Sequence, residues 1–177
     1  MSTNASSTSS PSAWNRRLLI LLLATVDFAL AVYMAMYQWR LIDSVWDPVF
    51  GSPQSHQVLD SAVSEAFRRA LFIPDTALGA AAYLAEVLLA LVGSTQRWKT
   101  RPWLVIAFGG NALAVALVGV VLLVLQPTVV GAWCLGCVLT AVFSVVMLWL
   151  ALPEVRASIG HLRNRNVPRL PPARNAR

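Results

Sequence analysis

The sequence predicts an all-α integral-membrane bundle of four helices, with a short surface helix in the first outer loop. Of the 177 residues, 57% are apolar and only 12% are charged, and the mean hydropathy of +0.62 is too high for an ordinary soluble domain. A membrane-spanning helix needs about 20 mostly apolar residues. The chain has four such stretches: Leu18–Tyr37, Thr76–Gly93, Trp103–Leu125 and Trp133–Leu152.

The first stretch has a second interpretation, because it also resembles a secretory signal peptide. The pair Arg16-Arg17 precedes a leucine-rich run, and Ala29-Leu30-Ala31 has the small residues of a cleavage site. Apolar residues continue beyond this point to Tyr37, however, which exceeds the short apolar core of a cleaved signal. We therefore interpret the stretch as a retained membrane span.

The distribution of Lys and Arg predicts the orientation, since cationic loops stay on the cytoplasmic side of a membrane. Basic residues cluster before the first span, between the second and third, and after the fourth, whereas the loop at 38–75 holds three arginines against five acids. Both termini are therefore expected on the cytoplasmic side of an inner membrane, and the loops at 38–75 and 126–132 on the outer side. The basic residues that carry this inference are Arg16, Arg17, Arg97, Lys99, Arg101, Arg156, Arg163, Arg165, Arg169, Arg174 and Arg177.

The two ends of the chain lack the pattern of a packed element. The first dozen residues are rich in Ser and Thr, and the last twenty combine Arg with Pro. We expect a disordered cytoplasmic head at residues 1–15, a membrane domain at 16–153 and a basic, disordered cytoplasmic tail at 154–177. The net charge of +6 does not indicate a nucleic-acid partner, because the basic residues flank membrane spans and are better matched to anionic membrane lipid.

The loop at 38–75 contains one amphipathic segment. Asp60-Ser61 offers a helix N-cap, and apolar residues then recur on one face. We expect a short helix that lies on the membrane surface and is ended by Pro74, after which Asp75 or Thr76 caps the second span. The apolar face consists of Ala62, Val63, Ala66, Phe67, Ala70 and Leu71.

Cys134 and Cys137 are the only cysteines, and their spacing puts both thiols on one face of a helix. At the start of the fourth span, free amides and the helix dipole favour a thiolate, so Cys134 is expected to be the more acidic thiol, nearer water and more readily attacked. A disulfide closing so small a loop stabilises a fold by only about 2 kcal/mol in the entropic model, which favours exchange chemistry over a structural role. The alternative is two buried apolar cysteines that fall three residues apart by chance.

A metal centre is not expected, because structural zinc requires four Cys or His ligands and the chain holds only two of each. His161 belongs to the opposite side of the membrane from the thiols. His56, in the outer loop, could approach them, although a solvated loop histidine is the simpler interpretation.

Two acidic residues fall inside spans, where charged groups are costly. Asp27 lies midway through the first span and Glu86 midway through the second, so the two carboxyls are expected at similar depth. They are candidates for a proton relay. The alternative, which also applies to Asn111, is a neutral, hydrogen-bonded group that packs helices together.

Four features follow one another in a recognisable order: four spans, a long outer loop with a surface helix, a Gly-x-x-x-Tyr second span, and a Cys-x-x-Cys pair that opens the fourth. The segments concerned are Ser55–Ser61 (SHQVLDS), Ile73–Tyr83 (IPDTALGAAAY) and Trp133–Thr140 (WCLGCVLT). Over roughly residues 16–153 the chain resembles the vitamin K epoxide reductase family. The Cys-x-x-Cys pair alone is moderately specific, but together with this topology it is a strong signal.

The resemblance implies a membrane thiol oxidoreductase that passes electrons from thiols to a quinone, menaquinone or ubiquinone, held inside the four-helix bundle. Carried onto this sequence, it makes Cys137 the quinone-facing sulfur and Cys134 the sulfur that exchanges disulfides. The candidate quinone-binding residues are Asp75, Gly79, Tyr83 and Ser55.

Three features depart from the family's pattern. Asp75 stands where the family places a polar group, normally an amide, near the quinone carbonyl. Ala141 stands where the animal enzymes have a quinone-contacting tyrosine, so that contact is missing. The outer loop lacks the two cysteines that usually relay electrons between a partner and the membrane pair, and Ser55 aligns with the second of them. An internal disulfide relay is therefore impossible.

The missing cysteines leave three hypotheses. In the first, an external thioredoxin-fold protein or a small thiol reacts directly with Cys134. In the second, the chain is a quinone-binding or structural bundle without disulfide catalysis. In the third, the two thiols pass a soft metal ion. We favour the first, a quinone-linked thiol oxidoreductase with Cys134 as nucleophile, Cys137 as electron donor to quinone, and no bound metal.

Overall fold

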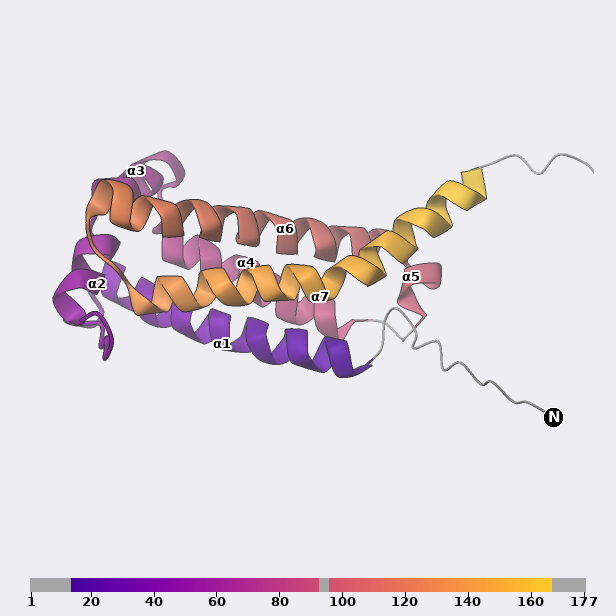
Figure 1. Ribbon diagram of the computed structural model, residues 1–177, viewed down its shortest axis with the longest axis horizontal. Coiled ribbons are helices and arrows are strands. Elements are labelled where there is room, and N and C mark those ends of the chain that lie inside the picture. The colour runs from indigo at the N-terminus through magenta and orange to yellow at the C-terminus, as the bar shows by residue number, and fades with distance from the viewer. Residues whose placement is uncertain (1–13, 93–95, 167–177) are drawn as a thin grey trace, which may run out of the picture.

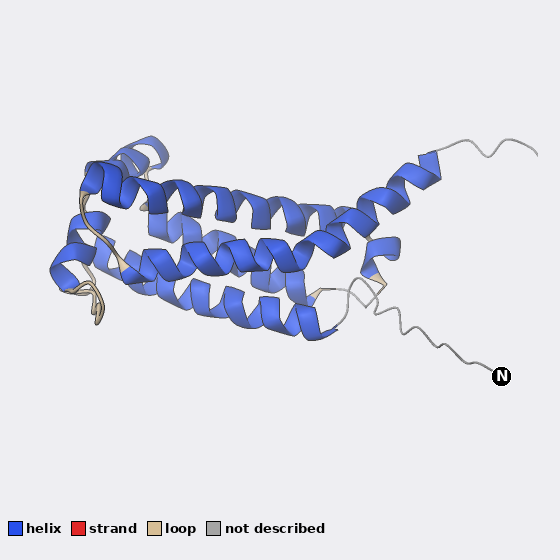
Figure 2. Cartoon of the chain, viewed as in Figure 1, coloured by secondary structure: helices blue, strands red, loops and turns tan. Residues whose placement is uncertain are grey.

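The computed structural model describes residues 14–92 and 96–166. Of these residues 83% are helical and none lies in a strand, so the predicted all-α class is confirmed (Figure 2). Four long helices run side by side, with shorter helices gathered at the two ends of the bundle (Figure 1). In chain order the elements are α1 (Trp14–Gln38), α2 (Ser52–Leu59), α3 (Ala62–Leu71), α4 (Asp75–Leu91), α5 (Arg97–Thr100), α6 (Pro102–Leu125), η1 (Gln126–Val130) and α7 (Leu135–Asn166).

Three of the long helices, α1, α6 with η1, and α7, are long and apolar enough to cross a membrane. The predicted second span is α4, whose 17 residues extend for only about 26 Å, a little less than the hydrocarbon core of a bilayer. Together with α3, from which it is bent by 67°, α4 also meets the length and hydropathy of a span. The chain is therefore a multi-pass membrane protein, with three spans by helix length alone and four when the bent pair is included.

The long helices pack closely because small side chains lie where they meet. Ala24 and Ala112 are completely buried, and Gly119 lies so near the backbone of Ala141 that an added Cβ would be 3.2 Å from its Cα. In a bilayer, close contacts of this kind are the main source of helix association, since apolar side chains gain nothing by leaving lipid. Larger core residues, Phe108 and Met147, fill the space between them.

One end of the bundle, which we call the thiol end, holds α2, α3, η1 and the start of α7 (Figure 1). The predicted surface helix is α3, and Ser61 is its N-cap, accepting a hydrogen bond from the Ser64 backbone amide at 3.3 Å. The helix ends earlier than expected, because Phe72 adopts a left-handed conformation with φ 62°. Helix α2 was not predicted from the sequence.

The opposite end, which we call the arginine end, is closed by two buried guanidinium groups. Arg17 from α1 donates to the carbonyls of Ala90 and Val92, and Arg97 donates to Val92 and, at 2.6 Å, to Leu89. The two side chains thus satisfy carbonyls that the last turn of α4 leaves without helical partners. Arg97, considered above only as a loop charge, is completely buried.

Helix α7 continues to Asn166, beyond the expected boundary of the membrane domain at residue 153. Pro153 lies inside the helix, and the last turns of α7 diverge from the bundle in Figure 1. The extension is held by Glu154, which is buried and accepts two hydrogen bonds from Arg97. Residues 1–13 and 167–177, where most of the predicted head and the end of the tail fall, lie outside the described residues.

Candidate active site

The two cysteines meet at the start of α7. The helix begins at Leu135, so Cys134 occupies the N-cap position, and its sulfur accepts a hydrogen bond from the backbone amide of Cys137 at 3.3 Å. The thiol of Cys137 donates to the same sulfur at 2.8 Å. Both cysteines are free thiols. Cys134 precedes the α7 span, and the hydrogen bond from the Cys137 thiol lowers its pKa against the opposing effect of burial.

We expected Cys134 to be exposed at the mouth of the bundle, but the structure buries it. Its side chain is completely buried, whereas Cys137 is partly exposed. Val45 and Leu59, from the loop before α2 and from α2 itself, pack in one cluster with Cys134. Hydropathy alone placed Cys134 at the mouth of the bundle, but it could not show that the outer loop folds back over it.

A single carboxylate, that of Asp47, joins the outer loop that covers Cys134 to the start of α7. Asp47 accepts hydrogen bonds from the backbone amides of Val49 and Phe50, from the Ser55 hydroxyl at 2.6 Å and from the Leu135 amide at 2.9 Å. We call Asp47 with these four donors the Asp47 latch. Burial raises the pKa of Asp47, but the four hydrogen bonds outweigh it and bring the pKa to about 2.

Sequence reasoning missed the Asp47 latch, because Asp47 was considered only as an acidic residue of the outer loop. A local signal was present: Asp47 precedes Pro48, and Asp-Pro favours a turn in which the Asp side chain accepts from amides two and three residues ahead. The signal could identify the turn but not the distant partner Leu135.

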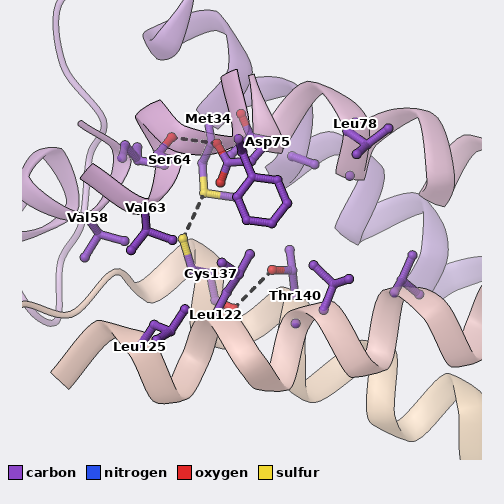
Figure 3. Close-up of a pocket in the computed structure, with 18 of the residues that line it drawn as sticks. Met34, Val58, Val63, Ser64, Asp75, Leu78, Leu122, Leu125, Cys137 and Thr140 are labelled. Atoms are coloured by element: carbon purple, nitrogen blue, oxygen red, sulfur yellow. Dashed lines mark hydrogen bonds between the residues drawn. The ribbon is translucent and has the colours of Figure 1, made fainter. Parts of the chain in front are cut away.

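Beside the thiols lies a cavity of about 280 Å³ with mostly apolar walls. All four long helices contribute to it, and Val63, Ser64 and Phe67 of α3 line it as well. Figure 3 shows Cys137 and Thr140 on one side of this cavity, with Met34, Ser64 and Asp75 on the other. The sulfur of Cys137 therefore has a buried Cys134 behind it and a ligand-sized space in front.

Three of the four candidate quinone-binding residues, Asp75, Gly79 and Tyr83, line this cavity. The Tyr83 hydroxyl is hydrogen-bonded to Ser144 at 3.0 Å. Ser55 differs: it does not belong to the described residues that line the cavity, and its hydroxyl is bonded to Asp47 close to Cys134 instead. A position in the loop that aligns with a relay cysteine is thus next to the buried thiol, not next to the ligand space.

The sequence suggested that Asp75 or Thr76 caps α4, but neither residue does so. Pro74 occupies the N-cap position, no side chain caps the helix, and Asp75 is its first residue. One carboxylate oxygen, Oδ1, accepts hydrogen bonds from the Ser64 hydroxyl at 2.7 Å and from the Gln38 amide at 2.8 Å. The carboxylate therefore belongs to a network that joins α1, α3 and α4 at the cavity wall.

Met34 is a third sulfur at the site and was not identified from the sequence. Its Sδ lies 3.7 Å from the Cys137 sulfur and 3.9 Å from the Cys134 sulfur. Gly136, between the cysteines, allows this contact, since an added Cβ would come within 2.9 Å of Met34 Sδ. A methionine within an apolar span has no sequence feature that separates it from ordinary core residues.

His56 is neither a solvated loop residue nor a partner of the thiols. Its Nε2 accepts a hydrogen bond from the Val45 amide at 3.0 Å, and its ring stacks on Tyr37 with centroids 4.5 Å apart. No group of three or more His, Cys, Asp or Glu side chains suited to a metal ion occurs within residues 14–92 and 96–166.

Asp27 and Glu86 are completely buried, and they are near enough for their carboxyls to interact electrostatically. Within the described part of the chain, none of their four carboxyl oxygens has a hydrogen-bond partner. The expectation of a hydrogen-bonded packing group is therefore wrong for Asp27. The Glu86 carboxyl lies next to the Asn111 side chain, which itself donates to the Ala82 carbonyl at 3.0 Å.

The fold and the site together define a membrane-embedded helical bundle with a paired-thiol centre facing an internal cavity. The family model described as vitamin K epoxide reductase family matches residues 18–152. The chain belongs to the vitamin K epoxide reductase family, whose members are membrane thiol-disulfide oxidoreductases that generally use quinones. A comparison with curated proteins gave no match.

Proposed function

We propose that this chain is a quinone-linked thiol oxidoreductase in which Cys134 and Cys137 alternate between two thiols and a disulfide. The observation that carries the proposal is the position of the Cys137 sulfur, on the cavity wall and 2.8 Å from the Cys134 sulfur. When the disulfide forms, two S–H bonds break, and two electrons and two protons pass to the quinone, whose two carbonyls become hydroxyls. The reverse direction uses the same groups.

The cavity fits the head group of a menaquinone or ubiquinone in size and chemistry. Its volume of about 280 Å³ lies at the lower end of the range for small-molecule sites, and its walls are mostly apolar with a few polar groups at defined places. Asp75, Gly79 and Tyr83 would hold the ring beside Cys137. The quinone supplies a two-electron acceptor, and the residues of the chain orient it and exclude water.

Cys134 is the proposed nucleophile toward an external thiol or disulfide. Its lowered pKa and its position at the helix N-cap favour the thiolate. Because the side chain is completely buried, exchange with a thioredoxin-fold protein or a small thiol requires the Asp47 latch to open. The proposed cycle therefore has a closed state for electron transfer and an open state for exchange.

The test uses the purified, reduced, full-length chain under anaerobic conditions. Addition of a menaquinone or ubiquinone analogue should remove two titratable thiols per chain and yield one quinol, and Cys137→Ser should abolish both changes. Diamide, a soluble oxidant, serves as the control because it forms the disulfide without the cavity. A chain that diamide oxidises while the quinone leaves both thiols intact would refute quinone coupling.

We also propose the orientation predicted above, with the head (1–15) and the tail (154–177) on the cytoplasmic side of an inner membrane that contains the domain at 16–153. The structure supports this orientation, because basic residues gather at the arginine end of the bundle, which is then the cytoplasmic end, and the thiol end is the outer end. Reporter fusions after Arg177 and at Lys99 should report a cytoplasmic location, and a fusion at Gly51 an external one. An external reporter at the tail would overturn this orientation.

One alternative has an observation of its own. Met34, Cys134 and Cys137 bring three sulfur atoms together at distances of 2.8, 3.7 and 3.9 Å, and such soft ligands suit a monovalent ion such as Cu(I). A titration of the reduced chain with Ag(I) separates the two functions. Stoichiometric binding that Met34→Leu weakens, in a chain that quinone does not oxidise, would favour the ion-binding function.

A further inference from the structure

Asp75 presents an unusual group to the cavity, because a carboxylate accepts hydrogen bonds and donates none. Its Oδ1 already accepts from Ser64 and Gln38, as Figure 3 shows for Ser64. Its Oδ2 accepts no hydrogen bond from any residue in the described part of the chain, and the residue lines the cavity and is half-buried. A ligand at this place therefore meets an acceptor.

The neighbouring donors do not change this conclusion, because they are engaged with the protein. The two N–H groups of the Gln38 amide are shared among three acceptors: the Leu59 carbonyl at 3.1 Å, the Ser64 hydroxyl at 2.7 Å and Asp75. The Thr76 hydroxyl donates to the amide oxygen of Gln38. The network holds the carboxylate in place, and each of these donors is already bonded to a protein acceptor.

The two oxidation states of a quinone differ in what they offer to such a group. A quinone carbonyl is an acceptor, so placing it against Asp75 brings two acceptors together in an apolar cavity, which is unfavourable. A quinol hydroxyl is a donor and forms a charge-assisted hydrogen bond with a carboxylate. An amide, the group expected at this position in the family, can serve either oxidation state, because it both donates and accepts.

The same carboxylate lies near the reacting thiol. Asp75 and Cys137 line one cavity and are close enough to interact electrostatically. A ring whose hydroxyl is bonded to Asp75 is therefore held at the end of the cavity where the thiol pair lies, so a preference at Asp75 acts on the molecule that exchanges electrons.

We propose that Asp75 makes the cavity select the reduced, hydroxyl-bearing form of its quinone over the oxidised form. This inference rests on the proposed quinone-linked function. Stronger binding of the reduced form makes the bound couple a stronger oxidant, by about 30 mV for each tenfold preference in a two-electron reaction. On the protein, this preference favours electron transfer from the thiols to the bound quinone: Cys134 and Cys137 lose two electrons and two protons as the S–S bond forms, and both carbonyls of the ring become hydroxyls.

The test compares the binding of two redox-inert probes, 1-naphthol and its methyl ether 1-methoxynaphthalene, which differ only in the donor. Binding to the full-length chain in detergent is followed by tryptophan fluorescence or calorimetry, with no turnover. In the wild type, 1-naphthol should bind at least about tenfold more tightly than the ether, the factor expected for one charge-assisted hydrogen bond. The Asp75→Asn variant should lose most of this preference. Once diamide has converted the thiols to the disulfide, so that no electrons can be transferred, the variant should also bind menadione, an oxidised quinone, more tightly than the wild type does.

Two variants serve as controls. Asp75→Glu keeps the acceptor and should keep the preference for 1-naphthol, which separates the chemistry of the carboxylate from a general disturbance of the site. Asp43→Asn removes the charge of an exposed loop carboxylate and should change nothing. Comparing each variant with the wild type also cancels the different partition of the two probes into detergent.

The binding results distinguish a failure of selection by Asp75 from a failure of the quinone site itself. Equal binding of the two probes to the wild type, or a preference that survives in Asp75→Asn, would overturn the selection by Asp75 while leaving the quinone site in place. If neither probe nor menadione binds, the cavity is not a quinone site, and the proposed function fails together with the inference. A lost preference in Asp75→Asn with a retained one in Asp75→Glu would support the assignment.

Discussion

Replacing Asp47 by Asn should expose Cys134 to reagents that do not cross membranes. The wild-type carboxylate accepts two hydrogen bonds at each oxygen: Oδ1 from the Val49 and Phe50 amides, Oδ2 from the Ser55 hydroxyl and the Leu135 amide. An Asn side chain has nearly the same shape but only one acceptor oxygen. If its NH₂ group replaces Oδ2, the bonds donated by the Leu135 amide and the Ser55 hydroxyl are both lost, and the Ser55 hydroxyl can only turn to accept a weaker, uncharged bond. The substitution therefore removes two hydrogen bonds from the Asp47 latch without removing side-chain volume.

The expected magnitude follows from those two bonds. A hydrogen bond to a charged group contributes about 1.5 kcal/mol or more, so the closed state loses about 3 kcal/mol relative to an open one. Because 1.4 kcal/mol corresponds to a factor of ten, the open population should rise by about 100-fold. When opening and closing are fast relative to labelling, the labelling rate rises by the same factor.

The assay measures the labelling of Cys134 by a membrane-impermeant maleimide, with each cysteine resolved by mass spectrometry. The matched control is Asp43→Asn, an exposed carboxylate of the same loop that should label at the wild-type rate. Circular dichroism verifies that both variants keep their helices. Equal labelling rates for Asp47→Asn and the wild type would refute the conclusion that the Asp47 latch controls access to Cys134.

Three further predictions concern the same structure. Ser55→Cys should form a disulfide with Cys134 on oxidation, because the two side chains interact in the wild type. The disulfide is detected as a gel shift that should vanish on reduction and in the Cys134→Ala background. If diamide produces no gel shift, the geometry is contradicted. Glu154→Gln should destabilise the bundle by about 3–5 kcal/mol by leaving buried Arg97 without its anion, and chemical unfolding that is unchanged would count against this pair. The pKa of about 2 for Asp47 lies below its unfolded value of about 3.9, so its stabilisation is complete above about pH 4 and is lost as the pH falls through 2. The difference in unfolding temperature between the wild type and Asp47→Asn should accordingly narrow below pH 4, and a constant difference would argue against the depressed pKa.

The membrane helices could be predicted from the sequence because the signal is local. Runs of apolar residues located α1, α4 and α6 with ends within a few residues of those observed. The N-cap Ser61 could also be predicted, since a cap and its helix are neighbours in the chain. The Cys-x-x-Cys spacing likewise predicted that the two thiols meet, because residues three apart share a helix face.

What lies over and beside the thiols was decided by contacts between distant parts of the chain. Asp47 binds the Leu135 amide across 88 residues, and Met34 touches Cys137 across 103. No hydropathy window or motif spans such separations, and the same side chains would be ordinary loop and core residues in another packing. The order of exposure of the two cysteines is therefore a property of the tertiary structure: hydrophobicity determines which segments enter the membrane, whereas the folding of the outer loop onto α7 determines which sulfur a ligand or partner can reach.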